Sequence, residues 1–315
     1  MRGATEKMSY VEPVPGAVGI YLVDTNQFGL DHHGAAYIVR GAQVAVVETG
    51  LSYSTERLLG ALRELGISNE DVIYIVVTHI HLDHAGGAGF LAEACPNATV
   101  VVHERGARHL ADPSRLVESV REATGPMFPR YGQVKPIPRE RLLPLEGGEI
   151  LSLGGGYRLA AIATPGHAPH HLCFLERRTG ALFAGDAAGI WWPHLGRLLP
   201  TTPPPSFNLE QSLTSLERLG DLEPRVLLFT HFGAHPRPKE MLRQYAELLR
   251  SWVEEIEGLH RRLREQRAVE EEMIKRYLPI FQGYCDDHLL QHEIAMNTKG
   301  VLRYLAWRGR PLSSS

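Results

Sequence analysis

The sequence predicts an α/β fold with a helical extension at its C-terminal end. Residues 72–77, VIYIVV, are a continuous apolar run that is typical of a strand buried on both faces. Strand and helix patterns alternate around this run, as in a sheet covered by helices. After residue 239 only helical patterns follow. The length of 315 residues is sufficient for such a layered domain together with an extension.

Short apolar runs bounded by turn residues predict the strands. They span residues 18–23, 35–39, 43–48, 72–77, 99–103, 149–153, 157–164, 171–176, 181–184 and 226–230. Apolar residues at intervals of three and four predict helices over residues 55–65, 88–94, 112–125 and 208–219. The Pro-rich segments 125–138 and 191–207 are expected to be irregular. We expect the first to be a surface excursion and the second to be a functional loop.

An apolar stripe in the C-terminal part predicts a long amphipathic helix. The stripe consists of Leu242, Tyr245, Leu249, Trp252, Ile256, Leu259 and Leu263. We expect it to pack on the chain's own body, with a homodimer contact as the alternative. Further helices are predicted over residues 273–278, 289–296 and 300–307. The chain therefore divides into a main domain, residues 1–238, and a helical extension that packs on it, residues 239–315.

Composition and charge narrow the function classes. The net charge of −3 and the isoelectric point near 6.6 give no electrostatic reason to bind nucleic acid. The sequence has no run of 18 apolar residues, so we expect no membrane span. The first residues, MRGATEKMSYVEPVPG, lack the apolar run of a signal peptide. Three dispersed cysteines, Cys95, Cys173 and Cys285, favour a reducing cytoplasm over a disulfide framework.

Potential metal ligands follow the buried strand directly. His79, His81, Asp83 and His84 lie within six positions after residues 72–77. Two glycines follow at positions 86 and 87, so we expect these side chains on a loop. Imidazole and carboxylate groups together suit zinc, and also iron or manganese. The sequence therefore predicts a metal site here.

Three further ligand-type side chains also follow predicted strands. His167, Asp186 and His231 each come directly, or after a short turn, behind an apolar run. In α/β proteins such strand ends gather at one edge, where the functional site lies. We expect these three side chains to join the histidine-rich loop.

The order of these motifs resembles the metallo-β-lactamase superfamily. The match consists of His79-x-His81-x-Asp83-His84, Thr164-Pro165-Gly166-His167, Gly185-Asp186 and Thr230-His231, within about residues 18–235. The resemblance implies a four-layer αβ/βα sandwich, with residues 1–238 as the catalytic domain, and two divalent metal ions. It implies that one ion takes His79, His81 and His167, that the other takes Asp83, His84 and His231, and that Asp186 bridges them. With Asp186 and His231 present, the chain is similar to the glyoxalase II and lactonase side of the superfamily.

The ligand set and the resemblance predict a hydrolase that cleaves a small-molecule ester, thioester or lactone, with zinc expected first among the metals. Two ions about 3.5–4 Å apart can share a water and lower its pKa to roughly 7, which gives a bridging hydroxide. We expect Asp83 to bind one ion, orient the hydroxide and take a proton. The alternative is an oxidoreductase similar to persulfide dioxygenases, which use one non-haem iron. A nuclease of the RNase Z type lacks support, because no strongly positive stripe is present.

Candidate substrate contacts lie near the ligands in sequence. His170 stands where many relatives have glycine, and it is interpreted as a hydrogen-bond donor beside the ligands or, alternatively, as a substrate contact or extra ligand. Trp191, Trp192 and His194 follow Asp186 closely, and they either line the pocket or pack in the fold. The loop of residues 24–33, which contains His32 and His33, can overhang the site in this superfamily. In the extension, aromatic and apolar side chains are expected to shape an apolar pocket. They are Tyr277, Phe281, Tyr284, Met296 and Tyr304.

Other polar residues near these motifs receive structural interpretations. Glu48 is expected to be structural, in a turn that resembles the D-T-G turn of the superfamily. His235 is expected to be exposed to solvent. His288 and His292, four residues apart, are expected to lie on a helix surface or interface rather than to bind a metal.

Overall fold

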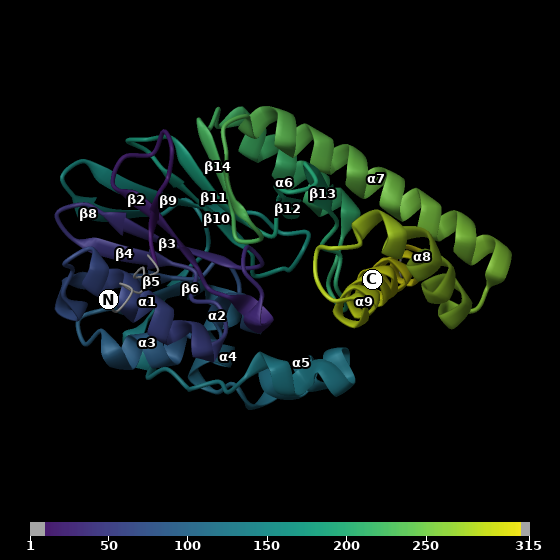
Figure 1. Ribbon diagram of the computed structural model, residues 1–315, viewed down its shortest axis with the longest axis horizontal. Coiled ribbons are helices and arrows are strands. Elements are labelled where there is room, and N and C mark those ends of the chain that lie inside the picture. Colours follow the sequence, from purple (N-terminus) through teal and green to yellow (C-terminus); the bar gives the residue numbers. More distant parts are fainter. Residues whose placement is uncertain (1–9, 310–315) are drawn as a thin grey trace, which may run out of the picture.

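The computed structural model describes residues 10–309 and contains two β-sheets packed face to face, with helices on their outer sides (Figure 1). The first sheet contains, in spatial order, β1 (Glu12–Pro13), β2 (Ile20–Asp24), β3 (Ala35–Arg40), β4 (Val44–Val47), β5 (Val72–Val76), β6 (Thr99–His103) and β7 (Leu142–Leu145). The second contains β15 (Gly233–His235), β14 (Val226–Phe229), β11 (Ala181–Gly185), β10 (Leu172–Glu176), β9 (Tyr157–Ala163) and β8 (Ile150–Gly154). A separate hairpin consists of β12 (Ile190–Trp192) and β13 (Arg197–Leu199).

The helices divide between the two sheets. Those that accompany the first sheet are α1 (Thr55–Glu64), α2 (Leu82–Ala85), α3 (Ala88–Ala94), α4 (Glu104–Ala111) and α5 (Ser114–Thr124). Those that follow or cover the second sheet are α6 (Leu209–Asp221), α7 (Pro238–Leu263), α8 (Gln266–Phe281) and α9 (Asp287–Arg308). In Figure 1, α7 to α9 gather at one end of the molecule, beside the β12–β13 hairpin.

The alternation of side chains along the strands explains the layers. Ile38 of β3 packs against the helices of the first sheet, whereas its neighbour Tyr37 packs against the second sheet. In β10, Phe174 packs between the sheets and Cys173 packs toward α6 and α7. Apolar layers therefore lie between helices and sheet, between the two sheets, and between sheet and helices. This confirms the four-layer αβ/βα sandwich expected from the sequence.

The strand directions bring several strand ends to one edge. β5 is parallel to β4 and β6, and β11 is parallel to β14. β9 and β11 are both antiparallel to β10, so they point the same way. The sheets are also linked at this edge, because Leu172 N donates to Thr78 O and Ala35 N donates to Thr230 O, both at 2.7 Å. Segments that follow β5, β9, β11 and β14 thus lie close together.

The C-terminal helices complete the core on the side of the second sheet. The apolar stripe of α7 is buried as expected from Leu242 to Leu259, and Leu263 at its end is 36% exposed. The stripe packs with residues of α6, α8 and α9 in one apolar cluster. The chain's own body therefore covers this stripe.

Several element boundaries differ from the expectation. The helix expected over residues 112–125 is α5, which begins at Ser114, directly after Pro113, and α4, over residues 104–111, was not expected from the sequence. The break expected before residue 300 is absent, and α9 runs through it. Residues 125–138 lie at the surface as expected, since apart from the buried Met127 and Ile137 they are exposed or half-buried. Segment 191–207 is irregular only after the β12–β13 hairpin.

Residues 1–9 and 310–315 lie outside the described part of the chain, and so does most of the segment for which a signal peptide was considered. Between residues 10 and 309, no helix combines the length and hydrophobicity that a membrane crossing requires.

Candidate metal centre

The histidine-rich motif is held at the end of β5 by a single helical turn. His79 follows the strand, His81 is the residue that precedes α2, and Asp83 and His84 lie within α2. The turn is anchored because Thr49 donates to the His84 carbonyl from its backbone N at 2.9 Å and from Oγ1 at 2.7 Å. The local fold therefore directs the four side chains toward the edge that the two sheets share.

The remaining ligand-type side chains reach the same place from the second sheet. His167 follows β9 after a tight turn at Gly166, whose φ is +142° and where an added Cβ would lie 2.3 Å from Ser212 Oγ. Asp186 follows β11 directly, and its backbone N donates to Nε2 of buried His171 at 3.1 Å. His231 follows β14. All seven side chains predicted from the sequence are thus brought together.

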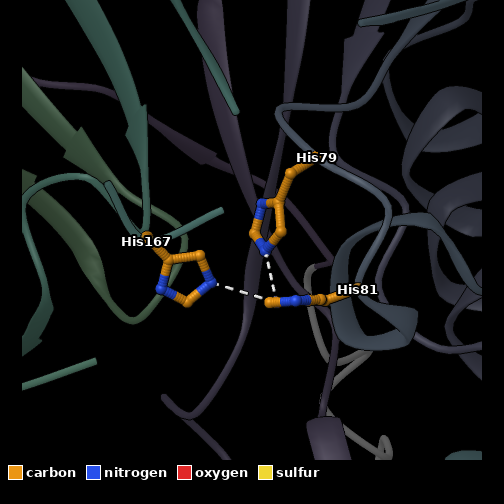
Figure 2. Close-up of side chains that lie close together, drawn as sticks. All are labelled: His79, His81 and His167. Carbon is orange, nitrogen blue, oxygen red and sulfur yellow. Dashed lines mark hydrogen bonds between the residues drawn. The ribbon is translucent and has the colours of Figure 1, made fainter. Parts of the chain in front are cut away.

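The first group consists of three histidines (Figure 2). His81 Nδ1 lies 2.9 Å from His79 Nε2 and 3.0 Å from His167 Nε2. As Figure 2 shows, His167 comes from a different segment than His79 and His81, and the three rings point toward one another. Three ring nitrogens thus converge on a common point.

The second group consists of Asp83, His84 and His231. His231 Nε2 lies 3.5 Å from Asp83 Oδ2 and 3.3 Å from His84 Nε2. Asp186 lies between the two groups: its Oδ2 is 3.4 Å from His167 Nε2, and its Oδ1 is 3.2 Å from His84 Nε2. One carboxylate therefore faces both groups.

The donor set fits a pair of divalent cations. Ligand atoms about 2.0–2.1 Å from a tetrahedral ion are roughly 3.4 Å apart, which is close to the spacings found here. Asp186 Oδ1 is buried and has no hydrogen-bond partner in the described chain. Because a buried carboxylate oxygen normally has a partner, this oxygen is suited to bind a cation. The residues present therefore fit the metal chemistry expected from the sequence.

The outer nitrogens of the histidine rings have partners of their own. His79 Nδ1 lies 3.1 Å from Thr78 Oγ1, and His167 Nδ1 lies 3.2 Å from the Thr201 carbonyl. His231 Nδ1 is 2.8 Å from the His33 carbonyl. His84 Nδ1 is 3.4 Å from Glu48 Oε1.

Contacts of this kind fix the orientation and tautomer of metal-binding histidines. Glu48 is buried, and the position of its carboxylate agrees with the structural role expected for it.

Burial and charge set different protonation states in the two groups. Burial, together with neighbouring histidines, lowers the pKa of His79 and His81 well below the usual value. Burial also lowers the pKa of His84, but Asp186, Glu48 and Asp83 raise it more, so its pKa lies well above the usual value. The pKa of His231 is raised in the same way, because Asp83 and Asp186 outweigh burial. The surroundings of the first group therefore favour neutral imidazoles, which can bind a cation, whereas the carboxylates beside His84 and His231 favour their protonated forms.

A cavity of about 450 Å³ opens onto the two groups. Cluster residues His81, Asp83, His167, Asp186 and His231 line it. Apolar side chains of α5 and α9 and a proline run supply much of the rest. These are Leu116, Val120, Ala123, Met296, Pro203, Pro204 and Pro205. The site is therefore a polar cluster at one side of a largely apolar chamber.

Some expected substrate contacts reach the cavity. His170 lines it, with its ring stacked 6.2 Å from that of His79, and burial lowers the pKa of His170 to about 4. Gln27, Phe28 and His33 of the N-terminal loop also line it. From the extension, Tyr284 and Met296 contribute.

Other expected contacts are not part of the lining. The Trp191 ring packs on His235, the Trp192 ring packs on Tyr284, and His194 lies against His32. Tyr277, Phe281 and Tyr304 pack in the apolar cluster of the helices.

The expectation that His235 is exposed was wrong, because this residue belongs to β15 and is 8% exposed. His288 and His292 belong to none of the potential metal groups in the described residues.

Sequence reasoning missed the wall that α5 and Glu293 of α9 provide. Leu116 and Val120 are one turn apart, which signals an amphipathic helix but does not say what the apolar face covers. In the sequence, Glu293 cannot be distinguished from an ordinary charged residue on the surface of a helix. No sequence signal identifies either as part of a cavity.

Known proteins with similar sequences carry different functional names. The chain is 33% identical over 203 residues to a metallo-beta-lactamase fold-containing protein of Sulfurisphaera tokodaii, which covers 61% of this chain and 75% of that protein. It is 28% identical over 240 residues to an acyl-coenzyme A thioesterase of Gallus gallus, and the match covers 70% of this chain and 81% of the thioesterase. It is 31% identical over 122 residues to an N-acyl homoserine lactonase of Azorhizobium caulinodans, and the match covers 39% of this chain and 42% of the lactonase.

The comparison of structures leads to the same group. The crystal structure of an archaeal metallo-beta-lactamase superfamily protein from Sulfolobus tokodaii matches with a TM-score of 0.65 and 25% identity, over 94% of this chain and 99% of the other. The family model described as the metallo-beta-lactamase superfamily matches residues 30–231, which hold all seven residues of the cluster. The chain therefore belongs to the metallo-beta-lactamase superfamily.

Proposed function

We propose that the protein is a metal-dependent hydrolase with a dinuclear site, and that it cleaves ester, thioester or lactone bonds. The observation that carries this proposal is the convergence of seven ligand-type side chains, at spacings suited to bound cations, on one side of a cavity. Zinc is the ion we expect first, because it suits a set of histidines and carboxylates, and iron and manganese share these ligands.

The two groups of side chains suggest how the ions would be held. His79, His81 and His167 would hold one, and Asp83, His84 and His231 would hold the other. Asp186 would bridge them, since its two oxygens face different groups at 3.4 and 3.2 Å. This assignment agrees with the ligand sets that the resemblance implied.

The protein's own residues prepare a hydrolytic step. When bound, two divalent cations would make a water more acidic and polarise the carbonyl oxygen of the substrate. Asp83 lines the cavity, so its carboxylate can orient the attacking water and take its proton. The proton then passes to the departing alcohol or thiol. In the described residues no cysteine lines the cavity, and its serines, Ser119 and Ser206, have no hydrogen bond to a histidine, which disfavours a covalent nucleophile.

The bond type is supported by chemistry and by relatives. An apolar chamber suits a neutral acyl compound better than a phosphodiester. One relative carries the name of a thioesterase and another that of a lactonase, and both names denote cleavage at an acyl carbon. In the described residues all three cysteines are free, which supports our proposal of a reducing, cytoplasmic setting.

Metal analysis followed by a substrate panel tests the proposal. We expect two zinc ions per chain and turnover of lactones, thioesters or carboxylic esters, with His81→Ala inactive toward all of them. One iron per chain, with oxygen uptake on glutathione persulfide, would instead establish the dioxygenase alternative. Turnover that is unchanged in His81→Ala would place the chemistry outside this cluster.

A further inference from the structure

Glu293 is a carboxylate on the cavity wall outside the metal cluster. It lies on α9, with Met296 and Asn297 three and four positions later, so the three side chains share one face of the helix. All three line the cavity. The C-terminal extension therefore presents a charged group to whatever occupies the chamber.

Among residues 10–309, no group donates a hydrogen bond to this carboxylate. Within residues 10–309 its nearest charge-type contact is His33 Nε2, which lies 3.9 Å from Glu293 Oε1 and is too distant for a hydrogen bond. Burial and the nearby His231 lower the pKa of His33 to about 3, so His33 is neutral. Burial raises the pKa of Glu293 to about 7, as expected for a carboxylate without donors. In the part of the chain that the structure describes, Glu293 thus depends on water for its hydrogen bonds.

The position of Glu293 is fixed by packing further along α9. The Asn297 side chain accepts a hydrogen bond from the backbone N of Thr202, and Thr202 Oγ1 donates to the Asn297 carbonyl at 2.9 Å. Gly300 lies so close to the same segment that an added Cβ would be 1.9 Å from the Thr202 carbonyl. The helix is therefore held firmly against residues 202–204, and Glu293 is presented from a rigid support.

His33 connects Glu293 to the metal cluster. The His33 carbonyl lies 2.8 Å from His231 Nδ1, and the His33 ring packs at a tilt against that of Tyr284, with 4.7 Å between centroids. Its Nε2 faces Glu293. The carboxylate is thus one residue removed from a candidate ligand, within reach of a substrate bound at the cluster.

We propose that Glu293 is a specificity-determining residue that accepts a hydrogen bond from the substrate, so that the site prefers apolar esters, thioesters or lactones that carry a hydroxyl or an amide N–H. This inference rests on the proposed hydrolase function. A substrate that fills the chamber displaces the water at Glu293. A substrate without a donor leaves the carboxylate buried and unpaired, which is costly, whereas a substrate with a donor satisfies it.

Matched pairs of substrates test the preference directly. The zinc-loaded protein is assayed with p-nitrophenyl octanoates that carry a hydroxyl at one of carbons 2 to 5, and with the corresponding methyl ethers, which lack the donor. We expect kcat/KM for one hydroxyl position to exceed that of its ether by about 10-fold or more. In Glu293→Leu the same ratio should fall to within about twofold of one. Glu293→Gln, which keeps a carbonyl acceptor, should retain part of the preference.

The control is Glu254→Gln, which removes an exposed carboxylate of α7 outside the cavity lining. It should keep the wild-type ratio. Wild-type protein with no preferred hydroxyl position, or the same ratio in wild type and Glu293→Leu, would overturn the inference. Thermal unfolding of each variant shows whether it is folded, and Glu293→Gln serves if the leucine variant is not.

A binding measurement separates this inference from the proposed function. Non-hydrolysable methyl ketones with the same hydroxyl or methoxy groups are titrated calorimetrically into wild type and Glu293→Leu. If no ester is hydrolysed, the hydrolase proposal fails, but tighter binding of the hydroxyl ketone to wild type alone still supports the role of Glu293. Equal binding of both ketones to wild type refutes that role.

Discussion

The metal cluster and the outer wall of the cavity are built in opposite ways. The cluster is polar, its side chains come from strand ends of both sheets, and hydrogen bonds hold the outer nitrogens of three of its histidine rings, while that of His84 faces the Glu48 carboxylate. The wall is mostly apolar and is contributed by α5 and α9, which lie more than 160 residues apart in sequence. From this difference we expect the proposed chemistry and the choice of substrate to depend on separate parts of the molecule, which substitutions can change independently.

The largest expected effect is the loss of the cluster's chemistry. His81→Ala removes the nitrogen that lies within 3.0 Å of both other histidines of the first group. We expect metal content to fall by one ion and kcat/KM by at least about 1,000-fold, since several kcal/mol of catalysis depend on the metal. Chelation of wild type should have the same effect and be reversed by zinc. His260→Ala, on the exposed side of α7, should change neither quantity.

The two groups should also respond differently to pH. His79 and His81 have lowered pKa values and are neutral at pH 6, whereas His84 and His231 have raised values and must lose protons before they bind a cation. The zinc affinity of the second group should therefore fall as the pH drops from 8 to 6, by up to about 10-fold per pH unit for each histidine that must release its proton, and the affinity of the first group should fall much less. Zinc titration at several pH values measures both. Parallel loss of the two ions would contradict this.

A smaller effect is expected for the buried partner of His84. Glu48→Gln weakens the contact to His84 Nδ1, and such outer partners typically contribute 10- to 100-fold to metal affinity. Zinc competition with a chelator should show this loss at one ion only. Glu176→Gln is a matched control, because Glu176 is also buried but accepts its hydrogen bonds in the turn between β10 and β11. It should lower thermal stability without changing zinc affinity.

The smallest effect is expected at the wall. Val120→Phe narrows the cavity from α5, so kcat/KM for octanoyl esters should fall about 10-fold relative to acetyl esters, with zinc content unchanged. Val117→Phe, on the same helix but outside the lining, should leave this ratio as it is. A loss of zinc in Val120→Phe would show that wall and cluster are not independent.

The cluster was predictable because each ligand lies next to a strong local signal. His79, His167, Asp186 and His231 each follow an apolar strand, and strand direction alone brings such positions to one edge. The layered architecture was predictable for the same reason. Alternating apolar and polar residues indicate a strand buried on one face, and continuous apolar runs indicate a strand buried on both.

The wall was not predictable because its signal is tertiary. Val120 and Glu293 have ordinary helix environments in sequence, and only the packing of α9 against residues 202–204 brings them to one chamber. The expectation that His235 is exposed was wrong for a similar reason. A strand of three residues has no recognisable period, and the Trp191 ring that packs on His235 is distant in sequence.

The close approach at Gly300 links a remote position to the shape of the chamber. Any side chain there would press on the Thr202 carbonyl and displace α9. Because a helix moves as a rod, Glu293 and Met296, about 10 Å and about 6 Å away along its axis, would move with it. A single substitution far from the cations could thus widen the range of accepted molecules while leaving the reactive machinery intact, which gives evolution or a protein engineer an indirect route to new selectivity.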